Sequence, residues 1–301
     1  IHCSYQFIFL LFKAIISIFG QWSFKVGLPP CLICSTHNKW KPKELLIGGL
    51  VVDLSKEDQV TTLNGLSNTA VQKGFESVDV SRVQPGTFGS ILTANKVGST
   101  IVGLNSLAGN ANTTGRDIIN GGAGNDTITG GTGPDRINPG SGTNTIIYNG
   151  TPDIVAGESL NLTATATDTI SVTNTTDFSN DGIDGAAGGA GNFDGLDVVD
   201  LGVGNFTVTF TAPQVTGETI TFNGTHATDQ LIVNTPVTGG VLDASNFTTA
   251  NIGTVTLNGS TATGGGTFNI TIGQATTLGD VDLSGMTANS TSLVTLNNGT
   301  T

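Results

Sequence analysis

Charge of either sign is scarce in this chain of 301 residues. Charged residues make up 11% of it, against about 25% in an average protein, and 23 Asp+Glu outnumber 11 Lys+Arg to give a net charge of −12. Because nucleic-acid binding needs clustered Lys and Arg to neutralise phosphates, nucleic acid is not expected as a partner. The helix formers Glu, Lys and Gln are also rare, which argues against a long helical bundle.

Glycine is abundant instead, with 43 residues, and Thr, Asn, Val and Ile recur along the chain. Low charge and high glycine content are found in disordered chains. The steady recurrence of apolar, β-branched residues favours a packed β structure over disorder. The composition therefore predicts an all-β protein.

Cysteine is confined to the first 43 residues. Cys31 and Cys34, with His37 nearby, form half of a possible zinc site. No second pair of this kind follows, so a chance pairing is the preferred interpretation. The absence of Cys from the remaining sequence suits a protein that is exported without disulfides.

Residues 1–43 differ sharply from the sequence that follows. They carry five Lys and no acidic residue, whereas residues 44–301 carry six basic and 23 acidic residues. Residues 5–24 are strongly apolar but are interrupted by Lys13. Three interpretations are open: an export or membrane-anchor segment, an apolar helix that caps a β domain, or non-native sequence. The abrupt change in composition and a single Met, at position 286, favour the last, and membrane contact is expected only if 5–24 is a native anchor.

Sequence signatures of common enzymes are missing. There is no His-Glu-x-x-His of zinc proteases and no Gly-x-Ser-x-Gly of lipases. His226 is the only His after residue 43 and follows Asn-Gly-Thr, so we expect it in an exposed turn. We therefore expect no enzymatic activity from this chain.

The strongest pattern is a nine-residue repeat over residues 112–147. Four consecutive lines of nine keep the same columns without an insertion, which is hard to obtain by chance. The columns hold Gly115, Gly124, Gly133 and Gly142, then Asp117, Asp126, Asp135 and Asn144, then Ile119, Ile128, Ile137 and Ile146. The two middle lines also begin with glycine pairs, at 121–122 and 130–131.

This spacing predicts a flattened parallel coil. Six glycine-rich residues make a tight turn, and three residues with a central Ile make a short strand whose Ile points inward. Because successive turns alternate sides, one full coil takes two repeats. Asp117 is then stacked with Asp135, and Asp126 with Asn144. Carboxylates this close repel each other unless a cation lies between them, and carboxylate and turn carbonyl oxygens suit Ca²⁺.

The segment resembles the hemolysin-type (RTX) calcium-binding repeat, Gly-Gly-x-Gly-x-Asp followed by x-apolar-x. The second and third lines match fully, the first lacks the leading glycine pair, and the fourth has Pro139 and Asn144. The resemblance implies a parallel β-roll with Ca²⁺ between same-side turns, in a family typically exported by bacteria. Asp117 and Asp135 would serve one site, and Asp126 with Asn144 a second, weaker one. The glycines of the implied sites are Gly115, Gly121, Gly124, Gly130 and Gly133. The alternative is a glycine-rich turn ladder without metal.

Acidic residues outside the repeat fall into a second motif, apolar-Asp-apolar-small. It occurs around Asp53, Asp79, Asp200, Asp243 and Asp282. These Asp residues could bind ions, but their alternating neighbours favour side chains that face solvent or cap turns. The last two belong to a 39-residue match, Asp243 to Leu257 with Asp282 to Leu296, which suggests stacked coils.

We divide the chain into residues 1–43, a β-roll module at 44–150 and a Thr/Asn/Gly-rich β-repeat region at 151–301. Period-two alternation predicts strands in the last region, as further β-solenoid or as β-sandwich repeats. The loop from Asn180 to Asp200 is either another calcium loop or a solvated linker.

These features predict a calcium-binding extracellular protein with a structural or adhesive role on the bacterial surface. A surface layer, an extracellular fibre or a repeat adhesin would fit, with possible self-association. The runner-up is the calcium-binding, export-competent part of a secreted toxin or hydrolase whose catalytic domain lies elsewhere. A third possibility is a ligand-binding sandwich within residues 151–301.

Overall fold

We describe the protein from a computed structural model. The structure describes residues 39–40, 50–63, 65–69, 71, 73–81, 89–104, 116–154, 158–163, 166–180, 193, 195–234, 241–244, 246–258, 267–272 and 291–296. The segment 5–24 and the cysteines lie outside these residues. Within them, no helix has the length and apolar character needed to cross a membrane.

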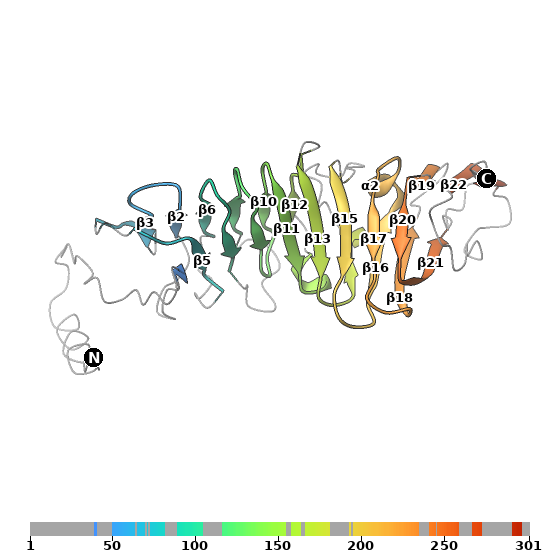
Figure 1. The fold of residues 1–301 in the computed structure, drawn as a ribbon, viewed down its shortest axis with the longest axis horizontal. Helices are drawn as coiled ribbons and strands as arrows, with labels where there is room; N and C mark the ends of the chain where they lie inside the picture. The colour runs from blue at the N-terminus through green and yellow to red at the C-terminus, as the bar shows by residue number, and fades with distance from the viewer. Residues whose placement is uncertain are drawn as a thin grey trace, which may run out of the picture.

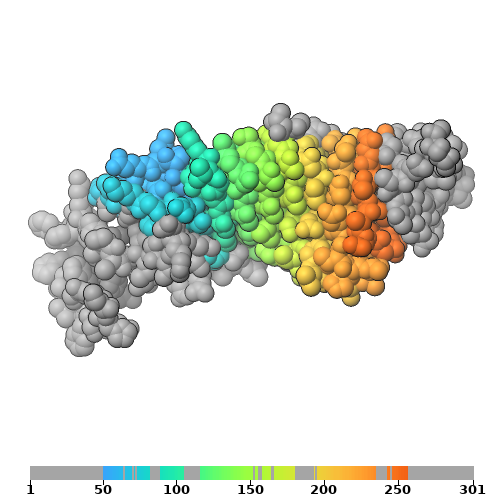
Figure 2. All heavy atoms as spheres, viewed as in Figure 1, coloured from blue at the N-terminus to red at the C-terminus, as the bar shows by residue number. Residues whose placement is uncertain are grey.

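Parallel strands stack along one axis into an elongated β-solenoid (Figures 1 and 2). The longest sheet runs in the order β1 (Lys39–Trp40), β5 (Ser77–Asp79), β7 (Thr100–Val102), β9 (Thr127–Thr129), β11 (Thr143–Tyr148), β13 (Thr167–Val172), β15 (Leu196–Leu201), β17 (Thr221–Asn223) and β20 (Thr248–Ala250). A second sheet runs in the order β12 (Ser159–Leu160), β10 (Arg136–Asn138), β8 (Ile118–Asn120), β6 (Ile91–Thr93), β2 (Val51–Asp53), β3 (Val60–Leu63) and β4 (Leu66–Ser67). Among the described strands, only the β2–β3 and β3–β4 pairs are antiparallel.

Two smaller sheets complete the stack toward the C-terminus. One runs in the order β14 (Thr176–Asp177), β16 (Thr207–Thr211), β18 (Asp229–Asn234) and β21 (Ile252–Asn258), and the other in the order β19 (Val241–Ala244), β22 (Thr267–Ile272) and β23 (Thr291–Leu296). Helical structure among the described residues is limited to single turns, at η2 (Thr151–Asp153), η3 (Phe178–Asn180) and α2 (Ala212–Val215). The predicted all-β fold with a parallel β-roll is confirmed.

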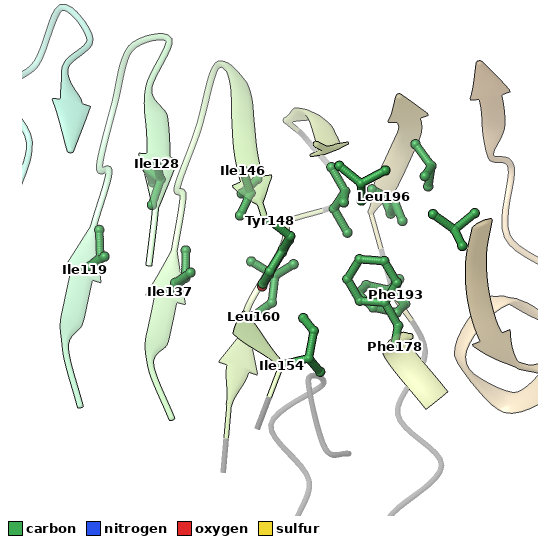
Figure 3. Packing of buried hydrophobic residues seen from close by; sticks show 14 of the residues in the cluster. Ile119, Ile128, Ile137, Ile146, Tyr148, Ile154, Leu160, Phe178, Phe193 and Leu196 are labelled. Atoms are coloured by element: carbon green, nitrogen blue, oxygen red, sulfur yellow. The ribbon is translucent and has the colours of Figure 1, made fainter. Parts of the chain in front are cut away.

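The repeat forms coils of the predicted length. Ile119 of β8 pairs with Ile137 of β10, and Ile128 of β9 with Ile146 of β11, in each case two repeats later. All four side chains have no exposed surface and point into the coil from alternate sides (Figure 3). Each strand of the repeat therefore contributes one Ile to the core, as its short length dictates.

The coils widen after the repeat, and aromatic rings fill the added space. Tyr148 lies edge-on to Phe178 at 5.4 Å between ring centroids, and Phe178 is stacked on Phe210 at 4.9 Å. The series continues from Phe210 to Phe222 and on to Phe247. One hydrophobic core runs through the solenoid from Leu50 to Val255.

The described strands after residue 150 continue the solenoid and do not form a sandwich. β13 pairs in parallel with β11 along the whole length of both strands, and β15, β17 and β20 follow in the same sheet. The division of the chain at residue 150 stays a prediction, since the stacking crosses it without a break.

The 39-residue match is not the spacing between stacked strands. Val255 pairs with Leu231, and Val294 pairs with Ile270. In both cases the paired residue lies much closer in the sequence than the match would place it. The strands of this region therefore stack, but with a shorter period than the one predicted.

The apolar-Asp-apolar-small motif caps a turn at two of its positions, Asp53 and Asp79. The Asp53 carboxylate accepts hydrogen bonds from the backbone and hydroxyl of Ser55, and Asp79 does the same with Ser81. Asp282 and most of the loop from Asn180 to Asp200 lie outside the described residues.

Candidate calcium centre

The Asp positions of the repeat form two columns, one on each side of the coil. The first column contains Ser90, Asp117, Asp135 and Glu158, and the second contains Ser99, Asp126, Asn144 and Asp168. In the first, the Asp117 backbone N–H donates to Asp135 Oδ1 over 2.8 Å. In the second, the Asp126 backbone N–H donates to Asn144 Oδ1 over 3.0 Å. Both predicted stackings are therefore present.

The leading glycines of the complete repeat lines leave room for these carboxylates. A Cβ on Gly121 would lie 2.8 Å from Asp126 Oδ2 and 2.1 Å from the Pro139 carbonyl oxygen. A Cβ on Gly130 would lie 2.7 Å from Asp135 Oδ2. A Cβ on Gly121 would therefore overlap the backbone of the next coil, and a Cβ on Gly130 would displace the Asp135 carboxylate. Glycine lets each turn pass its own carboxylate without either shift.

The inner glycines of the turns have a different role. Gly124 has φ of +109° and Gly133 has φ of +152°. Residues with a Cβ rarely adopt such values, and glycine adopts them without strain. Gly115, predicted in the same column, lies outside the described residues.

One oxygen of Asp126 and one of Asp135 have no partner. Both residues are fully or almost fully buried, and no donor reaches Oδ2 of either side chain. Burial raises the pKa of Asp126 to about 6 and that of Asp135 well above its ordinary value. For Asp135, the nearby carboxyls of Asp117 and Glu158 add to the effect of burial. A buried carboxylate oxygen without a donor calls for a proton or a cation.

The donor set fits calcium. Asp126 and Asp135, in different columns, would each hold an ion through its free carboxylate oxygen. Carbonyl oxygens of the surrounding turns, such as that of Pro139 beside Asp126, would add to the ligands. A bound Ca²⁺ would supply the positive charge that the buried carboxylates lack. Within the described part of the chain, no three Asp, Glu, His or Cys side chains gather around one point. The rest of the six to eight oxygen ligands that Ca²⁺ takes would come from backbone carbonyls, neutral side chains or water.

Asp117 differs from the other two predicted carboxylates. Its Oδ1 accepts the backbone N–H of Ser90 over 2.7 Å, and its Oδ2 accepts that of Leu104 over 2.6 Å. Burial raises the pKa of Asp117 to about 7, against these hydrogen bonds. Its role as a calcium ligand stays a prediction.

The first repeat line lacks a leading glycine in the sequence, but Gly103 occupies the equivalent position in the structure. A Cβ on Gly103 would lie 2.6 Å from Asp117 Oδ2, as close as those of Gly121 and Gly130 lie to their carboxylates. In the sequence, however, Gly103 is much farther from Asp117 than Gly121 is from Asp126. The inserted residues hide this glycine from a nine-residue pattern.

Two buried acids outside the repeat extend the columns and were not predicted. Glu158 Oε2 accepts the Asp135 backbone N–H over 2.7 Å, and the Tyr148 hydroxyl lies 3.4 Å from Oε1. Burial raises the pKa of Glu158 well above its ordinary value. Asp168 pairs in register with Asn144. A shorter pattern, acid-x-apolar, would have found both, in Glu158-Ser-Leu and Asp168-Thr-Ile.

Comparison with known proteins agrees with this geometry. Residues 112–146 match the RTX calcium-binding nonapeptide repeat in four copies, a repeat that binds calcium. No curated protein and no solved structure matches the chain. The coils at the centre of this solenoid are therefore an array of hemolysin-type (RTX) calcium-binding nonapeptide repeats.

Proposed function

We propose that the chain is a calcium-binding structural or adhesive protein of the bacterial surface and not an enzyme. A surface layer, an extracellular fibre or a repeat adhesin would use it in this way. The observation that carries the proposal is the position of the unpartnered oxygens of Asp126 and Asp135. They are buried between stacked coils. An ion bound there would join neighbouring coils and would not be placed to contact a substrate.

The shape of the molecule supports a structural role. Coils with and without the repeat share one axis and one hydrophobic core, so the calcium array is built into a rod (Figure 1). RTX repeats occur generally in secreted proteins, which supports placement outside the cell. The absence of cysteine from residues 44–301 is compatible with this placement.

A row of hydroxyls along the longest sheet supports an adhesive or self-associating role. The register of the sheet aligns Thr100, Thr127, Thr145, Thr169 and, beyond Val198, Thr221. These residues alternate with buried ones, so they lie on the outer face, and all are at least partly exposed. Neighbouring strands stand about 4.8 Å apart, so the row offers regularly spaced, uncharged contacts.

Calcium titration of the full chain tests the calcium-dependent part. We expect circular dichroism to report a gain in β structure, with a midpoint near the roughly 10⁻⁴–10⁻³ M of extracellular calcium modules. Magnesium at the same concentration is the control. A spectrum that does not change up to about 10 mM calcium would rule out calcium-dependent folding.

Sedimentation in calcium tests the self-associating part. If the hydroxyl row is a contact face, the parent chain forms larger species and a Thr127→Lys, Thr145→Lys variant does not, because aligned charges repel. Equal sedimentation of the two would remove this face from the proposal. A monomeric parent would leave the runner-up, a calcium-binding part of a secreted toxin or hydrolase, as the better function.

A further inference from the structure

An unpartnered carboxylate oxygen also occurs beyond the matched repeat. Asp168 is in β13, one coil after Asn144, and its side chain has no exposed surface. Its Oδ2 has no hydrogen-bond partner, like Oδ2 of Asp126 and Asp135. The family match ends at residue 146, so no repeat includes this position.

The contacts of Asp168 repeat those of the two acids within the array. In each of the three side chains, Oδ1 accepts a hydrogen bond and Oδ2 accepts none. For Asp168 the donor is Asn144 Nδ2, at 3.0 Å. Burial raises the pKa of Asp168, and the Asn144 amide and the nearby backbone of Thr163 only partly offset it.

Asn144 occupies a ligand position of the repeat, and both ends of its side-chain amide are engaged. Its Oδ1 accepts the Asp126 backbone N–H and its Nδ2 donates to Asp168. The amide therefore works as a bridge that fixes Asp168 Oδ1 and leaves Oδ2 available. The fourth line of the repeat therefore has an amide, Asn144, in the Asp column, and the carboxylate is supplied by Asp168 in the next coil.

Asp229 shows how the same position is satisfied without a cation. Gly224 precedes it by five positions, and a Cβ there would lie 2.8 Å from Asp229 Oδ2, as in the repeat lines. Its Oδ1 accepts the Phe206 N–H, and its Oδ2 accepts those of Thr225 and His226 at 2.8 and 2.9 Å. Asp168 has no such donors to Oδ2, although it is equally buried.

We propose that Asp168 is a calcium ligand and that the ion array extends one coil past the nonapeptide repeat. The site takes a hard divalent cation between the coil of Asn144 and the coil of Asp168. Asn144 is its positioning residue, and Asp168 supplies the carboxylate. This inference rests on the calcium binding of the proposed function.

Counting bound calcium in the full chain tests the inference. We expect isothermal titration with CaCl₂ to show one ion fewer for Asp168→Asn than for the parent. Asp229→Asn is the matched control and keeps the parent number, because its carboxylate is satisfied by backbone donors.

Thermal unfolding gives a second readout that a purely structural role would not produce. In EDTA we expect Asp168→Asn to melt no lower than the parent, since the variant loses a buried negative charge that no ion offsets there. In calcium we expect it to melt lower than the parent. Asp229→Asn should melt lower by a similar amount in both conditions, because it weakens bonds to three backbone donors.

An unchanged ion count in Asp168→Asn, or an equal loss of melting temperature with and without calcium, would overturn the site. If the parent itself binds no calcium, the proposed function fails together with this inference. If the parent binds calcium and Asp168→Asn binds as many ions, only the inference fails.

Discussion

Space for a carboxylate is the main reason for glycine at the start of each complete repeat line. Gly121 lies against Asp126 Oδ2 and the Pro139 carbonyl, so the turn, the carboxylate and the next coil meet at one point. Gly122, the second member of the pair, has open space around it but a φ of +83°. Neighbouring glycines are therefore required for different reasons, and substitutions separate these reasons.

Gly121→Ala should weaken both folding and calcium binding. Its methyl group would overlap Pro139 O, and overpacking of this kind costs about 1–3 kcal/mol. Displacing Asp126 should raise the calcium midpoint. Gly122→Ala is the control: we expect a loss of about 1–2 kcal/mol from backbone strain and an unchanged midpoint. Urea unfolding and calcium titration measure both effects, and equal midpoints in the two variants would contradict the role given to Gly121.

Without calcium, stability should fall as pH rises. Burial raises the folded-state pKa of Asp126 to about 6 and of Asp117 to about 7, from 3.8. A raised pKa favours the folded state while the group is protonated, and this stabilisation is lost as pH rises through the folded-state value. In EDTA we therefore expect a lower melting temperature at about pH 8 than at about pH 5.

Calcium should remove this pH dependence, because it stabilises the charged carboxylates that otherwise require protons. Melting curves at both pH values, with EDTA and with excess calcium, measure it. A melting temperature in EDTA that is constant or rises over this range would show that the buried acids do not control stability.

Short strands with a single buried side chain are the elements of the repeat. β9 buries only Ile128, and the residues on either side face outward. Such a strand has little hydrophobic stabilisation of its own, so each Ile matters. β6 offers a comparison, because Ile91 is 41% exposed while the next residue, Leu92, is fully buried.

Ile128→Ala should destabilise the chain by about 2–5 kcal/mol, the usual range for a buried Ile. Ile91→Ala, the same change at an exposed position, should stay within about 0.5 kcal/mol. Chemical unfolding in excess calcium keeps ion binding constant while the two variants are compared. Similar losses in both would mean that the outer row of β6 is covered by other parts of the chain.

At the scale of the whole molecule, coil length determines what holds the coils together. Coils made of two repeats contain one Ile per strand and the carboxylate columns. Coils after β11 are longer, and their core contains a series of packed aromatic rings from Tyr148 to Phe247. We infer that the two parts respond differently to loss of calcium.

Hydrogen exchange with and without EDTA should locate this difference. We expect chelation to remove amide protection in β8 to β11 and to leave most of it in β15 to β18, whose aromatic core needs no ion. Because each coil contacts only its neighbours, such local loss is possible in a solenoid. Uniform loss along the chain would indicate a single cooperative unit instead.

The sequence predicts the repeat coils well because their period is strict. Fixed columns over four lines determine strand length, inward Ile and stacking of Asp117 with Asp135. Prediction fails where coil length changes. Gly103 is hidden by an insertion, and the coil from Asn144 to Asp168 is longer than two repeats. The 39-residue match misleads because Thr- and Asn-rich strands resemble one another at several spacings.

The carboxyl groups of the columns all point the same way along the rod. Asp117, Asp135 and Glu158 each accept a backbone N–H from the coil before them, and Asp229 does the same with Phe206. A cut between two coils would therefore leave bare amides on one fragment and bare carboxyls on the other. The two fragments could therefore rejoin only head to tail, with amides against carboxyls. The solenoid thus has a chemical direction as well as a length.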